Sequence, residues 1–73
     1  MEIKEFIRRM KRKGYDAGYN SAIDQIVISE NDHHVGLQPQ IIQKASYDEI
    51  LKYVRYEIEK LKSKTKGKID YIN

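Results

Sequence analysis

The sequence predicts a small all-α domain: an antiparallel hairpin in which a long or kinked N-terminal helix packs against a C-terminal helix over residues 46–63. Seventy-three residues leave room for only one small core. Apolar side chains recur at three- and four-residue steps near both ends of the chain. The chain has no cysteine, so no disulfide constrains another architecture. We expect residues 1–66 to form this domain and residues 67–73 to form a tail or a short edge strand.

The first helix is expected over about residues 2–27, bent or interrupted near Gly14. The segment contains two apolar stripes at helical spacing, and the second is rotated by about 160° from the first. One helix with two such stripes needs two packing partners. We therefore expect a homodimer, in which the second stripe forms the interface. The first stripe is Ile3, Phe6, Ile7 and Met10, and the second is Tyr15, Tyr19, Ile23 and Ile26.

The second helix has the clearest pattern in the chain. Ser46 precedes its apolar stripe and Glu49 follows three residues later, which is the spacing of a capping box. The pattern fades after Leu61, and Gly67 favours an end to the helix. The stripe consists of Tyr47, Ile50, Leu51, Val54, Ile58 and Leu61.

A small α+β fold is the alternative. Residues 25–29 contain three β-branched side chains in a row, which suit a strand better than the end of a helix. Residues 68–72 alternate as an edge strand would, and the two segments could pair. Residues 29–40 contain several turn formers and are predicted to be a connection.

The charge is divided unevenly along the chain. Residues 1–14 and residues 60–73 each carry an excess of four positive charges, whereas residues 15–59 carry an excess of five negative charges. In an antiparallel hairpin the two basic segments would meet and form one positive pole. Tyr53 and Tyr56 flank Arg55 outside the apolar stripe, and tyrosine is a favoured interface anchor. The predicted partner-binding residues are Arg8, Arg9, Arg12, Lys60, Lys62, Lys64, Tyr53 and Tyr56.

Chemistry-bearing motifs are scarce, so we expect no enzyme, no cofactor and no metal site. No glycine-rich phosphate loop is present, and the chain offers little concavity for a catalytic acid and base. The one cluster that resembles a metal site is Glu30, Asp32, His33 and His34, but adjacent histidines on an extended segment point in different directions. No apolar run approaches the roughly 20 residues of a membrane span. We therefore do not expect a membrane partner, and we expect a cytoplasmic location.

The expected function is that of a small non-catalytic protein-interaction module. One form would be a phage-type modulator or inhibitor that binds and occludes a larger host protein, in the host cytoplasm. Ile, Lys, Tyr and Asn make up 30 of the 73 residues, a bias typical of AT-rich coding sequence and common in phage genes. The alternative is a nucleic-acid-binding protein that acts through its basic ends, and its affinity would fall steeply with salt.

Overall fold

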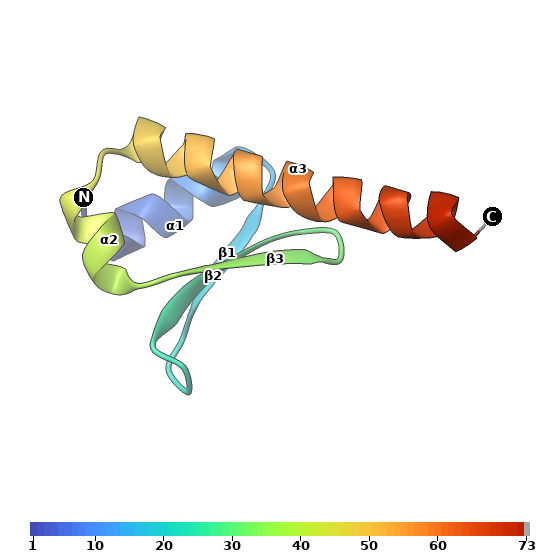
Figure 1. Ribbon diagram of the computed structural model, residues 1–73. Coiled ribbons are helices and arrows are strands. Elements are labelled where there is room, and N and C mark those ends of the chain that lie inside the picture. Colours follow the sequence, from blue (N-terminus) through green and yellow to red (C-terminus); the bar gives the residue numbers. More distant parts are fainter. Residues whose placement is uncertain (73) are drawn as a thin grey trace.

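A computed structural model describes the backbone of residues 1–72 and the side chains of residues 1–64. Within this part the three strands form an antiparallel sheet in the order β1-β2-β3. Helices α1 and α3 lie on the same side of the sheet (Figure 1). The fold is therefore α+β, and the predicted all-α hairpin is wrong. The elements are α1 (Ile3–Arg12), β1 (Asp16–Asn20), β2 (Gln25–Glu30), β3 (His33–Leu37), α2 (Pro39–Lys44) and α3 (Tyr47–Ile72).

Helix α1 ends at Arg12 because Gly14 turns the chain. Gly14 has a φ of 98°, in the left-handed region that glycine enters without steric cost. Its N–H donates to the carbonyl of Lys11 at 3.0 Å, and the Tyr15 N–H donates to the carbonyl of Met10 at 3.1 Å. These two bonds make a Schellman motif, which terminates a helix. A helix through residue 27 is thus wrong, although the predicted interruption at Gly14 is confirmed.

Strands β1 and β2 form a hairpin around residues 21–24. The turn is fixed by Asp24, whose φ is 51°, and by the Asn20 side chain, which accepts the Ala22 N–H at 3.0 Å. Ile26 and Ile28 alternate with outward side chains and are fully buried. The strand near residues 25–29 in the α+β alternative is confirmed. Its predicted partner at 68–72 is wrong, because the backbone of that segment belongs to α3.

Strand β3 occupies much of the segment predicted to be a connection. A two-residue turn joins it to β2, with Asn31 in the left-handed region at a φ of 56°. Val35 and Leu37 point into the core, while His34 and Gly36 lie on the other face and are exposed. Only two apolar side chains mark this strand, so its period of two is hard to distinguish from a loop.

Helix α3 begins where the sequence predicts it. The Ser46 hydroxyl lies 2.9 Å from Glu49 Oε1, and the Glu49 N–H donates back to the Ser46 hydroxyl at 3.3 Å. The Ser46 N–H also donates to Glu49 Oε1 at 3.3 Å, so the capping box is confirmed. The helix does not end at residue 63: its backbone continues to Ile72.

The core lies between the sheet and the helices. The Phe6 ring of α1 packs edge-on against Tyr47 at the start of α3, with the ring centroids 6.4 Å apart. Helices α1 and α3 run in the same general direction (Figure 1), rather than antiparallel. The buried apolar residues within the described part are Phe6, Met10, Ala17, Ile26, Ile28, Val35, Leu37, Ile42, Ile50, Leu51, Val54 and Ile58.

Candidate functional site

Two regions of the described surface expose large apolar side chains. Tyr19 and Ile23 lie on the β1–β2 hairpin, 53% and 55% exposed. Ile41 of α2 and Tyr53 of α3 are each 46% exposed, and Tyr56 lies one helical turn beyond Tyr53. Both regions border a depression, but the one beside Tyr19 is shallow, whereas the second lies where α3 passes beside the open edge of β3. We call the depression between these elements the β3–α3 groove.

The apolar end of the groove lies among β3, α2 and the first turns of α3. Its volume is about 520 Å³. Leu37 and Ile50 form buried walls, and Ile41 and Tyr53 stand at the solvent side. The full lining is Gln25, Gly36, Leu37, Gln38, Ile41, Ala45, Glu49, Ile50 and Tyr53.

The polar end of the groove continues along α3. Its volume is about 250 Å³, and it shares Gly36 and Tyr53 with the apolar end. The two cavities are therefore neighbours along β3. The lining of the polar end is His34, Val35, Gly36, Tyr53, Glu57, Lys60, Leu61 and Lys64.

The sequence builds this groove with a second stripe on α3. Its members recur at three- and four-residue steps, so they share one side of the helix, beside the buried stripe in which Ile50 also takes part. They are Ile50, Tyr53, Glu57, Lys60 and Lys64.

Two features on the facing side complete the apolar end. Gly36 leaves room for the Gln25 carboxamide, which a Cβ at this position would overlap. Ile41 and Ile42 are adjacent on the short helix α2, and Ile42 is buried while Ile41 is exposed. The adjacent pair is the only feature of the sequence that points to Ile41. Ile41 is not predicted as a surface residue from the sequence.

The electrostatics of the polar end favour an acidic ligand. Glu57 accepts a hydrogen bond from the Tyr53 hydroxyl at 3.5 Å and pairs with the Lys60 ammonium at 3.4 Å. The Lys60 ammonium also lies 5.5 Å from the centre of the Tyr56 ring. Lys64 forms no ion pair with any side chain among residues 1–64. Within the described side chains, one positive charge at this end is thus left without a counter-ion.

Lys62 does not belong to the groove. Its ammonium contacts Glu30 Oε1 at 2.6 Å and Glu59 Oε1 at 3.6 Å. The hydrogen bond to Glu30 raises the pKa of Lys62 above its ordinary value. This lysine therefore links α3 to the end of β2, a structural role.

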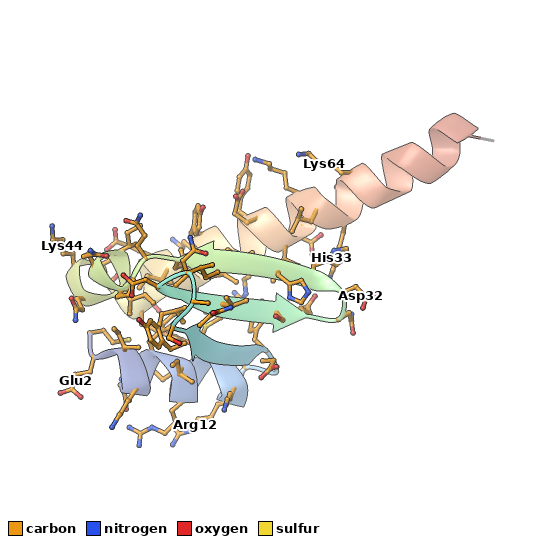
Figure 2. All side chains as sticks on the ribbon, turned by 90° about the horizontal axis from the view of Figure 1, so that it is seen from below. Glu2, Arg12, Asp32, His33, Lys44 and Lys64 are labelled. Atoms are coloured by element: carbon orange, nitrogen blue, oxygen red, sulfur yellow. The ribbon has the colours of Figure 1, made fainter. Side chains whose placement is uncertain are left out.

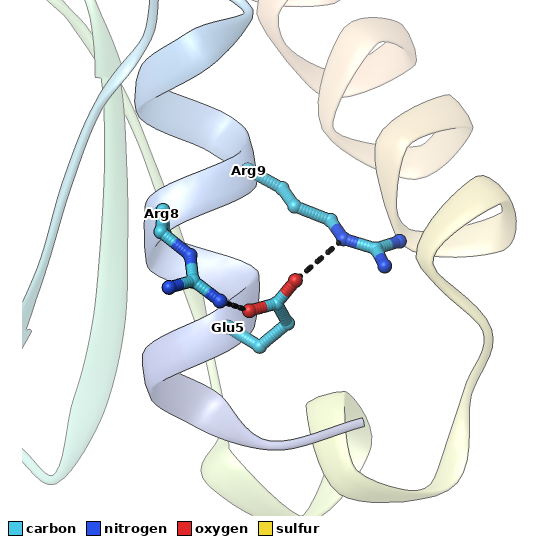
Figure 3. A network of polar contacts seen from close by, with 3 residues as sticks. All are labelled: Glu5, Arg8 and Arg9. Carbon is cyan, nitrogen blue, oxygen red and sulfur yellow. Dashed lines mark hydrogen bonds and ion pairs between the residues drawn. The ribbon is translucent and has the colours of Figure 1, made fainter.

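The predicted positive pole does not form. Arg8 and Arg9 both pair with Glu5 on their own helix, Arg9 through Nε at 3.0 Å (Figure 3). The Arg9 guanidinium also lies 5.2 Å from the centre of the Tyr47 ring, at the start of α3 rather than at its end. Arg12 and Lys64 lie on opposite sides of the molecule in Figure 2. The pole required antiparallel helices, and α1 and α3 run in the same direction.

The four residues predicted for a dimer interface do not share one face. Ile26 is fully buried in the intrachain core, and Tyr15 packs against that core. Tyr19 and Ile23 are exposed on the hairpin, where the Tyr19 hydroxyl donates to Asp24 Oδ1 at 2.7 Å. This hydrogen bond raises the pKa of Tyr19. The helical stripe that suggested an interface does not exist, and dimerisation itself stays a prediction.

The histidines point to opposite faces of the sheet. His33 is half-buried, whereas His34 is exposed on the face that no described helix covers, with its Nδ1 2.7 Å from the Ser29 hydroxyl. Asp16 lies opposite Ser29 in the sheet, and its carboxylate accepts the Ala17 N–H. Among the side chains of residues 1–64, no acid hydrogen-bonds the His34 ring, as a catalytic triad requires. No group of three potential metal ligands occurs within the described part of the chain.

No related protein adds to this description of the site. Among the residues that the structure describes, no helix has both the length and the apolar character needed to cross a membrane. No protein-family model, no curated protein and no solved structure matches the chain.

Proposed function

We propose that the protein is a small non-catalytic protein-interaction module that binds a segment of another protein in the β3–α3 groove. The observation that carries this proposal is the pair Ile41 and Tyr53. Each is nearly half exposed, and both overhang a cavity of about 520 Å³ whose walls include the buried Leu37 and Ile50. An exposed aromatic side chain beside a concave apolar surface is a typical anchor at protein interfaces.

Two further parts of the proposal go beyond what the geometry of the groove supports. The first is that binding occludes the partner, as a phage-type inhibitor or modulator would do. The second is that the protein acts in the cytoplasm, where a chain with no cysteine needs no oxidising compartment. Support for both comes from composition rather than from the groove.

Nucleic-acid binding stays the alternative prediction, without a specific observation in its favour. It required the two basic segments to act on one ligand. Arg8 and Arg9 are engaged with Glu5, and Lys62 is engaged with Glu30. Arg12 and Lys64 are on opposite sides of the molecule (Figure 2).

A matched pair of variants tests the groove. Ile41→Ser removes a 46% exposed isoleucine from the groove, and Ile23→Ser removes a 55% exposed isoleucine from the β1–β2 hairpin. The tagged full-length chain and both variants are used to capture proteins from a host lysate treated with nuclease. Each captured protein is then purified and titrated against all three chains.

We expect a purified partner whose affinity falls about five-fold or more for Ile41→Ser and is unchanged for Ile23→Ser. Equal affinity for all three chains would contradict the groove as the binding site. Capture only from a parallel lysate that was not treated with nuclease would instead favour the nucleic-acid alternative.

A further inference from the structure

We propose that the β3–α3 groove binds its partner as an added β-strand. The bound segment pairs antiparallel with the open edge of β3 and carries an apolar residue followed two positions later by an acidic residue. This inference rests on the proposed function and names the form and chemistry of the ligand. Three features carry it: the open strand edge, the order of the two cavities along that edge, and the charge at the polar end.

The first feature is the edge itself. β3 is the outer strand of the sheet, and no strand of the described chain pairs with its far side. In an antiparallel pair, alternate residues direct their N–H and C=O groups away from the partner strand. β3 therefore presents unpaired backbone groups along the groove, which is a template for an extended segment.

The opposite edge of the sheet lacks this combination. The depression near β1 is shallow and is lined mainly by polar or small side chains, including Asp16, Gly18 and Asn20. Helix α3 flanks the β3 edge instead, so a segment added there can bury side chains against Ile50 and Tyr53. Main-chain pairing and side-chain burial are available together only at the β3 edge of the described sheet.

The second feature is the order of the cavities. The apolar end lies beside Leu37, and the polar end lies beside Val35, two residues away on the same face, and beside His34. Antiparallel pairing would continue the pattern of the sheet, so the segment enters at Leu37 and leaves at His34. Side chains two residues apart share a face and are about 7 Å apart along a strand. One side chain then enters the apolar end, and the second following side chain reaches the polar end.

The third feature is charge. Lys60 and Lys64 line the polar end, and among the side chains of residues 1–64 only Lys60 has a counter-ion there, Glu57. An acidic side chain on the bound segment would pair with Lys64, where the exposed side chain is free to meet it. A basic side chain in the same place would face two ammonium groups.

A second copy of this chain fits the groove less well. If two β3 strands paired antiparallel about their centres, the Leu37 end of one would lie at the His34 end of the other. The acidic residue that precedes β3, Asp32, would then approach the apolar end of the groove. The order of apolar and acidic groups would be reversed, so the structure favours a segment of a different protein.

The test uses a fluorescent octapeptide of serine and threonine that carries one isoleucine and, two residues later, one glutamate. Three matched peptides differ from it by glutamine for glutamate, by serine for isoleucine, or by exchange of the two positions. Two further peptides are methylated on alternate sets of backbone nitrogens. Binding to the full-length chain is measured by fluorescence anisotropy.

We expect the parent peptide to bind more tightly than each of the three matched peptides. Methylation should abolish binding for one alternate set and spare the other, since only one set faces β3. Lys64→Gln should weaken binding of the glutamate peptide about two- to five-fold, without affecting the glutamine peptide. Lys52→Gln, an exposed lysine of α3 outside the groove, should change neither affinity.

Failure of this inference can be told from failure of the proposed function. Equal loss with both methylated sets, or equal binding of the position-exchanged peptide, would overturn strand addition. So would absence of any peptide binding by a chain that captures a partner through Ile41. If the chain instead sediments as a dimer that Ile41→Ser dissociates, a second copy occupies the groove, and the inference is wrong.

Discussion

The two edges of the sheet expose similar apolar side chains and yet differ in what they can bind. Tyr19 and Ile23 near the β1 edge are 53% and 55% exposed, and Ile41 and Tyr53 near the β3 edge are each 46% exposed. Exposure alone does not distinguish the two edges, because Tyr56, on the α3 side, is 63% exposed. The β3 edge lies beside α3, however, and the helix converts an exposed strand into one wall of a groove. A concave neighbour is therefore the better indicator of a binding site than exposure.

The β1 edge is also protected against pairing. Natural sheets block open edges with short strands and polar side chains. β1 and β3 have the same length, but in β1 only Ala17 is buried, and the strand begins with Asp16 and ends with Asn20. Tyr19 is tied to Asp24 in the adjoining turn at 2.7 Å. The aromatic side chain at this edge is thus already engaged, whereas Tyr53 has only the long 3.5 Å contact with Glu57.

The largest effect should come from the core on which both edges depend. Phe6 is fully buried and packs against Tyr47, so Phe6→Ala leaves a cavity between α1 and α3. We expect it to cost about 3–5 kcal/mol of unfolding free energy. A chain of this length has an unfolding free energy of roughly 4–11 kcal/mol in total. The variant should therefore lose most or all of its folded structure, and both sheet edges with it.

Urea unfolding followed by circular dichroism measures this cost. Phe6→Leu, which keeps most of the volume, should cost less than about 1.5 kcal/mol. A cost below about 1 kcal/mol for Phe6→Ala would mean that α1 is not part of the common core.

The second largest effect should distinguish Gly14, in the turn before β1, from Gly18 inside β1. Gly14 has a φ of 98° and Gly18 does not have a positive φ, while neither has a neighbour within 4 Å of an added Cβ. Gly14→Ala should cost about 1–2 kcal/mol because alanine is strained in the left-handed region. Gly18→Ala should be neutral or stabilising by up to about 1 kcal/mol. Equal costs in urea unfolding would contradict the Schellman turn after α1.

These two glycines also show why the sequence misled. Gly14, Ala17, Gly18, Ser21 and Ala22 lie at helical spacing, so they continued the face of α1 on paper. In the structure the first ends the helix and the next two belong to β1. A strand with one buried side chain has no visible period of two, so its pattern could not compete with the helical one.

Other parts were predictable because their signals are local. The apolar stripe and capping box of α3 and the β-branched residues of β2 each depend on neighbours in sequence. The groove does not. Tyr53 could be predicted as a contact residue, but Leu37 and Ile41 meet it only after β3 and α2 have folded against α3. Spacing alone cannot bring these segments together.

The third effect concerns the start of α3, which frames the apolar end of the groove. Ser46→Ala removes the hydroxyl that accepts the Glu49 N–H, so it should cost about 0.5–2 kcal/mol. Ser63→Ala, far along the same helix, should cost nothing measurable, since alanine is the better helix former. Thermal or urea unfolding at neutral pH gives both values.

The capping box also predicts a pH dependence. Hydrogen bonds from the Ser46 hydroxyl, and then from its N–H, lower the pKa of Glu49. A lowered folded-state pKa means that the ionised form stabilises the fold above the unfolded pKa, and that this contribution is lost as the pH falls through the folded pKa. The stability gap between the parent and Ser46→Ala should therefore narrow as the pH falls below 4.5, the ordinary value for this carboxyl. A gap that widens in acid would contradict the capping box.

The smallest effect returns to the two edges. Ile41→Ser and Ile23→Ser each remove a side chain that is about half exposed, so each should change the unfolding free energy by no more than about 0.5–1 kcal/mol. If Ile41 serves a partner rather than the fold, its variant should be as stable as the Ile23 variant and differ only in binding. Urea unfolding of both chains beside the parent checks this equality. A cost above about 2 kcal/mol for Ile41→Ser alone would show that Ile41 supports the packing of α2 on α3. The groove would then be part of the core's outer layer, and the difference between the two edges would be one of stability instead of binding.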